Sequence, residues 1–221
     1  MKNFSIAIDG PAGAGKSTIA KQLAKKLGCI YIDTGAMYRA VGLYCINQHI
    51  DYNEENTVKD IIKSLKITID SKEQMQVIYL NGVDVSLEIR TNEVAAAASK
   101  VATYKDVREE LVRKQRQMQN EKSVIMDGRD IGTVVMPHAS LKIFLTASVE
   151  ERAKRRFDEY HSKGIQVSLD ALTTEIIDRD YQDSNREISP LRKAEDAIEV
   201  DTTQLTINEI VTKIMDLILQ E

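Results

Sequence analysis

The sequence predicts a three-layer α/β domain in which helices cover both faces of a parallel sheet. The first observation behind this prediction is an alternation of short apolar runs with helical patterns, which begins at residue 4. The second is a glycine-rich segment at residues 10–18, between the first apolar run and the first helical pattern. The third is the length of 221 residues, which suits one such domain with a small insertion. We therefore expect a single domain over residues 1–221.

The first two strand and helix pairs follow from local patterns. Residues 16–27 carry apolar side chains at helical spacing, and Gly28 suits the position after a helix end. Residues 29–32 predict a buried second strand, after which Thr34 is expected to cap another helix. This order indicates a parallel sheet, in which ligands bind beyond the carboxyl ends of the strands.

The pattern changes after about residue 53. Residues 65–69, 77–80 and 83–86 are predicted to be short antiparallel strands, and Asn81-Gly82 is a strong hairpin signal. We interpret this region as an inserted subdomain, which could cover a second substrate or have no functional role. A long helical stretch is expected at residues 93–119.

The remaining elements return to the first pattern. Residues 123–127 and 141–145 are predicted strands, and Ser148 opens a capping box for a helix. Residues 197–200 predict a last core strand, and Thr206 is expected to cap a final amphipathic helix.

The glycine-rich segment has the pattern of a phosphate-binding loop, G-x-x-x-x-G-K-[ST]. Its glycines allow backbone N–H groups to surround an anion, and the following helix adds the positive end of its dipole. Lys16 is expected to contact the β- and γ-phosphates of ATP, and Ser17 to bind Mg²⁺ together with Asp127, which ends a later strand. The predicted nucleotide-binding residues are Gly10, Pro11, Ala12, Gly13, Ala14, Gly15, Lys16, Ser17 and Thr18.

Composition excludes several classes of function. A net charge of −4 and a pI near 5.6 argue against a nucleic-acid-binding or membrane-surface protein. No apolar run approaches the length of a membrane span, and the first apolar run is too short for a signal peptide, so we expect a cytoplasmic protein. The chain lacks an N-K-x-D guanine motif and an H-R-D catalytic loop, which leaves a small-molecule kinase. Nothing suggests an obligate protein partner, so a monomer is the default expectation.

Arginines are concentrated in the second half of this acidic chain. Seven of the twelve arginines lie between Arg129 and Arg192. Guanidinium groups are favoured where phosphate oxygens must be bound in pairs, so this cluster predicts two substrates that both carry phosphate. An acceptor phosphate is already anionic near neutral pH, and such a reaction needs no general base.

Four motifs together resemble the bacterial cytidylate kinases, which are nucleoside monophosphate kinases with a P-loop NTPase core. The motifs are residues 9–18, 31–39, 127–133 and 179–186. The resemblance covers nearly the whole chain. It implies Mg²⁺-dependent transfer of the γ-phosphate of ATP to CMP or dCMP. It also implies that residues of about 34–105 form the region that binds the nucleoside monophosphate, and that residues of about 152–187 form a short helical lid.

The resemblance also implies roles for individual residues. The base-reading groups are Ser99, Arg108 and Asp130. This set suits cytosine, because a carboxylate accepts a hydrogen bond from its 4-amino group and an arginine donates to its O2 and N3. Uracil presents O4 and an N3–H at those positions, which would leave Asp130 without its donor.

Further residues are assigned by the same resemblance. Those that hold the acceptor phosphate or the sugar are Arg39, Arg129, Arg179 and Asp183. Thr34 is assigned to substrate binding and departs from the serine of some relatives, and its methyl group could shift the preference between ribose and deoxyribose. The residues expected near the transferring phosphate are Lys16, Arg129 and Arg186, with Arg155 and Arg156 from the lid.

Two other readings stay open at this stage. The same fold could use UMP, another nucleoside monophosphate or a small hydroxylated metabolite as the acceptor. The chain could also be a nucleotide-binding regulatory protein with little turnover. Acceptor-dependent release of ADP would separate an enzyme from that regulatory class.

Overall fold

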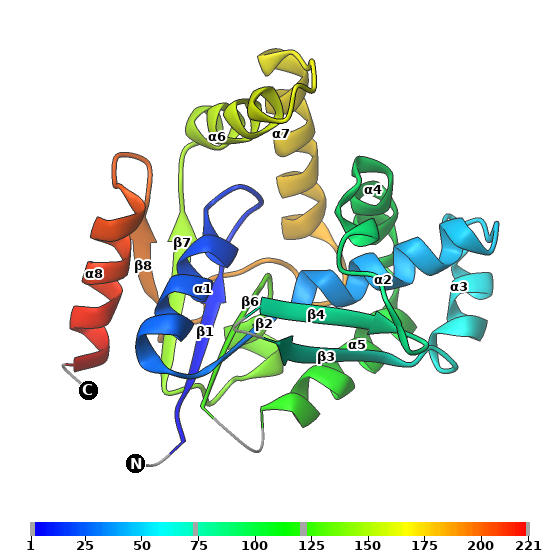
Figure 1. Cartoon of the computed structure of the whole chain (residues 1–221), viewed down its shortest axis with the longest axis horizontal. Coiled ribbons are helices and arrows are strands. Elements are labelled where there is room, and N and C mark those ends of the chain that lie inside the picture. Colours follow the sequence, from blue (N-terminus) through cyan, green and yellow to red (C-terminus); the bar gives the residue numbers. More distant parts are fainter. Residues whose placement is uncertain (1–2, 73–74, 120–122, 220–221) are drawn as a thin grey trace.

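The computed structural model describes residues 3–72, 75–119 and 123–219, which contain a five-stranded and a three-stranded sheet (Figure 1). All neighbours in the larger sheet are parallel, and their order is β2-β6-β1-β7-β8. Its strands are β1 (Ser5–Asp9), β2 (Ile30–Asp33), β6 (Val124–Gly128), β7 (Leu141–Thr146) and β8 (Ile198–Asp201).

Alternate residues of the central strand β1 point to two different apolar layers, as the pleat requires. Ile6 and Ile8 pack in one cluster with the helices α1 (Lys16–Leu27) and α8 (Ile207–Leu219). Ala7 packs in another cluster, on the face that is covered by α5 (Lys105–Met118). The predicted three-layer α/β class is therefore confirmed.

The helices α1 and α8 begin and end for the predicted reasons. Gly28 follows α1 with a φ of 63°, a left-handed conformation that glycine adopts without strain. Thr206 and Glu209 form a reciprocal capping box before α8, in which Glu209 Oε2 accepts from the Thr206 N–H and Thr206 Oγ1 accepts from the Glu209 N–H.

The region of the predicted insertion packs around its own apolar cluster, which extends into α5 through Val107 and Leu111. Asn81 and Gly82 both have positive φ, 51° and 86°, as expected for the predicted hairpin turn. The described elements of this part are α2 (Thr34–Asn47), α3 (Glu55–Ile62), β3 (Ile67–Lys72), β4 (Met75–Leu80), β5 (Val83–Asp84), a 3₁₀ turn (Glu88–Arg90) and α4 (Asn92–Val101).

The structure differs from the sequence-based description of this region in two ways. The helix α3 was not expected, and the single helix predicted over residues 93–119 is two helices, α4 and α5. The chain turns at Tyr104, whose backbone is extended and whose OH donates to the carbonyls of Tyr52 and Asn53. This anchor separates a helix that packs on α2 from one that packs on the main sheet.

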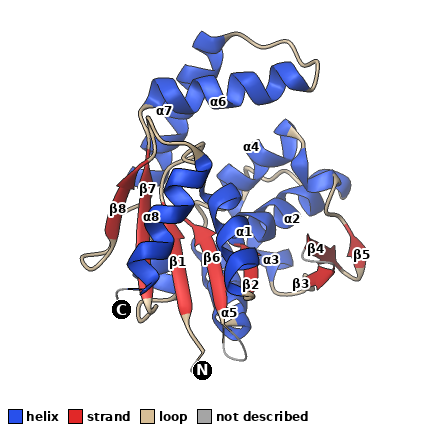
Figure 2. Ribbon diagram, turned by 60° about the vertical axis from the view of Figure 1, so that its left-hand side comes forward, coloured by secondary structure: helices blue, strands red, loops and turns tan. Residues whose placement is uncertain are grey.

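Two helices lie above the carboxyl edge of the main sheet, α6 (Val149–Ser162) and α7 (Leu169–Asn185), at the top of Figure 1. They pack against each other, and Figure 2 shows the loop that joins them at the outer end. Ser148 caps α6 by accepting from the N–H of Glu151, as predicted. No helix in the described ranges has the length and apolar character needed to cross a membrane.

Candidate active site

The glycine-rich segment turns sharply between β1 and α1. Gly10 has a φ of 147°, and a Cβ placed there would lie 2.1 Å from the carbonyl oxygen of Leu145, so no other residue fits. Gly13 and Gly15 also have positive φ, which a phosphate-binding loop requires. The ammonium of Lys16 folds over this loop and donates to the carbonyl of Pro11 at 2.7 Å.

Burial and positive neighbours perturb Lys16. Its side chain is almost inaccessible, and burial together with the charge of Arg129 lowers its pKa to about 7, against a partial offset from Asp127. Phosphate oxygens bound at the loop would supply the negative charge that the surroundings of this ammonium lack. The arrangement therefore favours binding of a polyanion at the loop.

Asp127 is the penultimate residue of β6, and three hydroxyl groups donate hydrogen bonds to it. Ser17 Oγ donates to Asp127 Oδ2 at 2.8 Å, and Tyr31 OH donates to Asp127 Oδ1 at 2.7 Å. Thr34 Oγ1 donates to the backbone carbonyl of the same residue at 2.7 Å. Burial, reinforced by the charge of Asp33, raises the pKa of Asp127 to about 6. The Ser17 hydroxyl and the Asp127 carboxylate therefore lie side by side, and oxygen ligands of this kind suit a hard cation.

The cap of α2 is Asp33, so the prediction that Thr34 caps this helix is wrong. Asp33 Oδ1 accepts from the N–H of Ala36 at 3.1 Å, while the hydroxyl of Thr34 is used to bind β6. Arg39 donates to Asp33 Oδ2 at 2.7 Å. Burial opposes ionisation of Asp33, but the Arg39 guanidinium outweighs it and holds the pKa of that carboxyl below its usual range.

A buried ion pair joins Arg108 of α5 to Asp130, which follows β6. The two side chains are 2% and 6% exposed, so the charges depend on each other. Arg108 Nη1 also donates to the carbonyl of Ala102 at 3.1 Å, and its guanidinium lies 5.4 Å from the centre of the Tyr38 ring. These contacts fix a donor and an acceptor side by side.

A second charged group links β6 to the end of α7. Arg129 Nε donates to Asp183 Oδ2 at 2.7 Å, and Arg186 donates to the carbonyl of Ser189 through two nitrogens. Burial and then the charge of Arg129 lower the pKa of Arg179 to about 10, which still leaves it protonated at neutral pH. Its Nε is buried without a hydrogen-bond partner among the described residues. The guanidinium groups of Arg129, Arg179 and Arg186 thus surround the single carboxylate of Asp183. Positive charge is in excess there, which favours binding of an anion.

These groups line one cavity of about 250 Å³. Ala12 and Gly13 of the glycine-rich segment line this cavity, together with twelve other predicted site residues. The twelve are Lys16, Ser17, Thr34, Arg39, Ser99, Arg108, Asp127, Arg129, Asp130, Arg179, Asp183 and Arg186.

Arg155 and Arg156 do not line this cavity. Arg155 donates to the hydroxyl and carbonyl oxygens of Thr202, and Arg156 pairs with Glu175 at 2.9 Å. Both lie on α6 as expected for lid residues, and their contact with the transferring phosphate stays a prediction. It requires the two side chains to leave their present partners.

The sequence is similar to that of a known protein family over nearly its whole length. The family model described as cytidylate kinase matches residues 6–220. The chain belongs to the cytidylate kinase family. It is 53% identical over 215 residues to the cytidylate kinase of Lactobacillus gasseri, which covers 97% of this chain and 94% of the relative. It is 52% identical over 218 residues to the cytidylate kinase of Bacillus anthracis strain A0248, with 99% and 97% covered.

Among solved structures, an uncharacterized protein from Eubacterium ventriosum is similar in fold alone. Its TM-score is 0.54 at 13% identity, and the match covers all of both chains. The predicted resemblance to the cytidylate kinases is confirmed by the family model and by the two relatives, not by this likeness in fold.

Sequence reasoning missed Arg152, which is the arginine of α6 that contacts the phosphate loop. Its side chain is 4% exposed, and it donates to the carbonyl of Ala12 at 3.0 Å and pairs with Asp180 of α7 at 2.6 Å. The sequence spacing of Arg152, Arg155 and Arg156 is that of one helix face, but it does not indicate which of the three is buried. In this member of the cytidylate kinase family, Arg152 of α6 joins the phosphate loop to α7.

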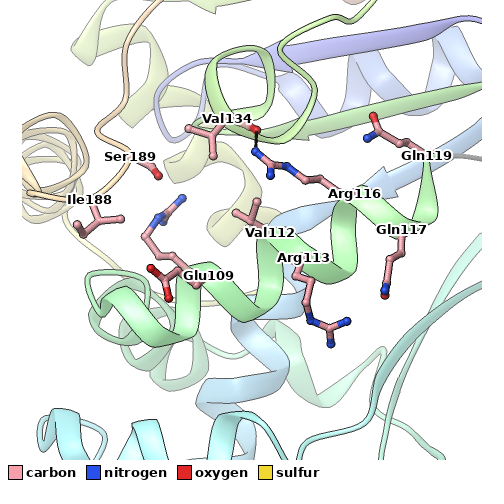
Figure 3. A pocket seen from close by; sticks show the side chains of 10 residues that line it. Glu109, Val112, Arg113, Arg116, Gln117, Gln119, Val134, Ile188 and Ser189 are labelled. Atoms are coloured by element: carbon pink, nitrogen blue, oxygen red, sulfur yellow. Dashed lines mark hydrogen bonds between the residues drawn. The ribbon is translucent and has the colours of Figure 1, made fainter.

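A larger hollow of about 560 Å³ lies along α5, between this helix and the segments that carry Val134 and Ser189. Figure 3 shows that it is framed by Val112 and Arg116 of α5 and by Val134 and Ser189 from other segments. Arg116 donates to the carbonyl of Val134 at 2.6 Å, so that guanidinium is already engaged. The hollow shares only Arg108 with the cavity beside the phosphate loop, and the smaller cavity is therefore the candidate active site.

Proposed function

We propose that the protein transfers the γ-phosphate of ATP to CMP or dCMP, giving ADP and CDP or dCDP. The observation that carries this proposal is one cavity with a phosphate-binding loop on one side and the buried Arg108–Asp130 pair on another. The loop suits the donor, because its lysine and backbone can hold phosphates. The ion pair suits cytosine, because it offers a donor and an acceptor in fixed positions. Family membership supports the same acceptor.

Mg²⁺ is part of the proposal. Ser17 Oγ and Asp127 Oδ2 fit it, because they are 2.8 Å apart and supply the oxygen ligands that this ion prefers. No group of three or more His, Cys, Asp or Glu side chains suited to a metal occurs within the described ranges. A site with one carboxylate is typical of Mg²⁺ that also binds substrate phosphates. When bound there, the ion would neutralise charge on the β- and γ-phosphates.

The acceptor phosphate is assigned to Arg39 and Arg129. Both guanidinium groups line the cavity and are held by a carboxylate, Asp33 and Asp183 respectively, which orients them without removing all of their donors. Arg179 and Asp183 are assigned to the sugar. Thr34 Oγ1 donates its proton to the Asp127 carbonyl, so toward the sugar it can only accept a hydrogen bond, and its methyl group could shift the choice between ribose and deoxyribose.

Transfer requires alignment and charge stabilisation more than proton removal. The acceptor oxygen is anionic at neutral pH, so the chain needs no general base. Arg129 and Arg186 line the cavity beside Lys16, where positive charge can stabilise the migrating phosphoryl group. Arg155 and Arg156 would join them when the lid closes, and closure would also exclude water that competes with the acceptor.

We propose a cytoplasmic monomer that acts on small molecules and does not bind nucleic acid. A net charge of −4 supports the last point, because nucleic-acid affinity depends on neutralising phosphates with basic residues.

The experiment that tests the proposal is ADP formation from Mg-ATP with CMP, dCMP, UMP, AMP, GMP, dTMP or no acceptor. High turnover with CMP and dCMP alone is expected. Preference for another monophosphate would keep the reaction type and reject the cytosine assignment. A lack of any acceptor-dependent ADP would reject the enzyme and favour a nucleotide-binding regulatory protein.

A further inference from the structure

Gln182 of the lid helix α7 makes two hydrogen bonds with Ser99 of α4. Its Nε2 donates to the backbone carbonyl of Ser99 at 3.1 Å, and its Oε1 accepts from the Ser99 hydroxyl at 3.3 Å. Ser99 lines the candidate active-site cavity together with Arg108 and Asp130. A side chain outside the predicted site set therefore controls a hydroxyl within it.

The backbone carbonyl fixes which end of the amide faces which group. A carbonyl oxygen only accepts, so the NH₂ end of Gln182 must face it, and the amide oxygen then faces the Ser99 hydroxyl. A serine hydroxyl has one proton, and this proton points to Gln182 Oε1. The free side of Ser99 Oγ therefore carries only lone pairs.

We infer that Gln182 is a specificity-determining residue, because it commits the Ser99 proton and makes this part of the base pocket accept hydrogen bonds only. This inference rests on the proposed function. The 4-amino group of cytosine is a donor and matches such a surface, whereas O4 of uracil is an acceptor and does not. The Asp130 carboxylate, which pairs with Arg108, adds a second acceptor to the same pocket. Gln182 acts through Ser99 and is a positioning residue.

A hydroxyl without this partner would lose the selectivity. An unrestrained Ser99 could rotate and donate to O4 of uracil, because a hydroxyl serves as donor or acceptor according to its neighbour. The mismatch that penalises UMP would then be relieved at Ser99 and retained at Asp130. Discrimination would be weakened but not abolished.

The same contact joins the lid to the inserted region. A second bond between these parts links Tyr160 of α6 to Asn92 at the start of α4, where Tyr160 OH donates to Asn92 Oδ1. This bond does not involve Ser99. It supplies a matched control, because its loss weakens the junction of lid and insert without freeing the Ser99 proton.

The test is the ratio of kcat/KM for CMP to kcat/KM for UMP in wild type, Gln182→Met, Ser99→Ala, the double variant and Asn92→Ala. Methionine keeps the length of the side chain and favours a helix, and it cannot hold the hydroxyl. We expect Gln182→Met to lower the ratio roughly five- to tenfold, mainly through better use of UMP. Asn92→Ala should change kcat or KM for both acceptors alike and leave the ratio unchanged.

The double variant separates positioning from a direct effect. If Gln182 acts through Ser99, Gln182→Met should have no effect on the ratio once Ser99 is alanine. A full additional loss in the double variant, or an unchanged ratio in Gln182→Met, overturns the inference. An unchanged ratio in Ser99→Ala overturns it as well, even should Gln182→Met fail to fold. Wild type that does not prefer CMP would instead reject the proposed function.

Discussion

Replacing Arg152 by methionine is predicted to destabilise the fold and weaken ATP binding together. The guanidinium donates to the carbonyls of Ala12 and Ala147, each at 3.0 Å, and pairs with Asp180 at 2.6 Å. A Cβ placed at Gly13 would lie 3.1 Å from Arg152 Cβ, so the stem of the side chain also packs against the loop. Methionine keeps most of this stem and removes every polar contact.

The magnitude follows from burial. Breaking a buried ion pair costs about 3–5 kcal/mol, because the remaining charge is left without its partner. The Asp180 side chain is 23% exposed, so water solvates part of that charge and the low end applies. We expect a loss of about 3 kcal/mol, or a fall in Tm of roughly 6–12 °C for a chain of this size. The KM for ATP should rise, because the carbonyl of Ala12 in the phosphate loop loses the hydrogen bond from Arg152 that holds it in place.

The assay is urea unfolding with linear extrapolation, run alongside ATP kinetics. The control is Arg152→Met combined with Asp180→Leu, which removes both charges and should recover most of the lost stability. A single variant that loses less than about 1 kcal/mol would refute the reasoning. A double variant that is less stable than the single one would refute it too.

Three further predictions concern the donor end of the cavity. Because the pKa of Lys16 is lowered to about 7, this side chain is mostly neutral at pH 8, and ATP binding there should take up nearly one proton. Calorimetry in two buffers of different ionisation enthalpy measures this uptake, and Lys16→Met should abolish it. In the unfolded chain Lys16 keeps its ordinary pKa of 10.5, so between about pH 7 and 10.5 the unfolded state binds more protons than the folded state. The contribution of Lys16 to the free energy of unfolding should therefore rise with pH above about 7. A contribution that falls there would contradict the assignment. Ser17→Ala and Asp127→Asn should each raise the Mg²⁺ concentration for half-maximal activity roughly tenfold or more, which a magnesium titration checks. The control is Tyr31→Phe, which removes a hydroxyl that donates to Asp127 but is not a predicted Mg²⁺ ligand. It should shift the half-maximal Mg²⁺ concentration less.

The phosphate loop and its flanking elements could be predicted because their determinants are local. Gly28 ends α1 and Ser148 opens α6 for reasons that a few neighbouring residues contain. The predicted site residues of the cavity came mainly from the resemblance to a family. Composition and spacing alone indicated an anion-binding region rich in arginine, but not which arginine faces which group.

The parts that could not be predicted depend on distant contacts. The break between α4 and α5 at Tyr104 is fixed by hydrogen bonds to carbonyls of residues 52 and 53, which no local pattern reveals. Asp33 caps α2 because the hydroxyl of Thr34 is drawn to β6, 93 residues away in sequence. Arg152 is buried because Asp180 and the loop carbonyls surround it, whereas its spacing is the same as that of a solvated helix face.

The most direct test of the central claim is a competition in which wild type and Asp130→Ala each receive limiting Mg-ATP with equal CMP and UMP, and the diphosphate products are separated and measured. The account predicts that wild type forms almost only CDP. It predicts that Asp130→Ala forms a larger share of UDP at a lower total rate, because the acceptor that matches the 4-amino group is gone. Equal CDP and UDP from wild type, or an unchanged product ratio in the variant, would contradict base reading by the Arg108–Asp130 pair.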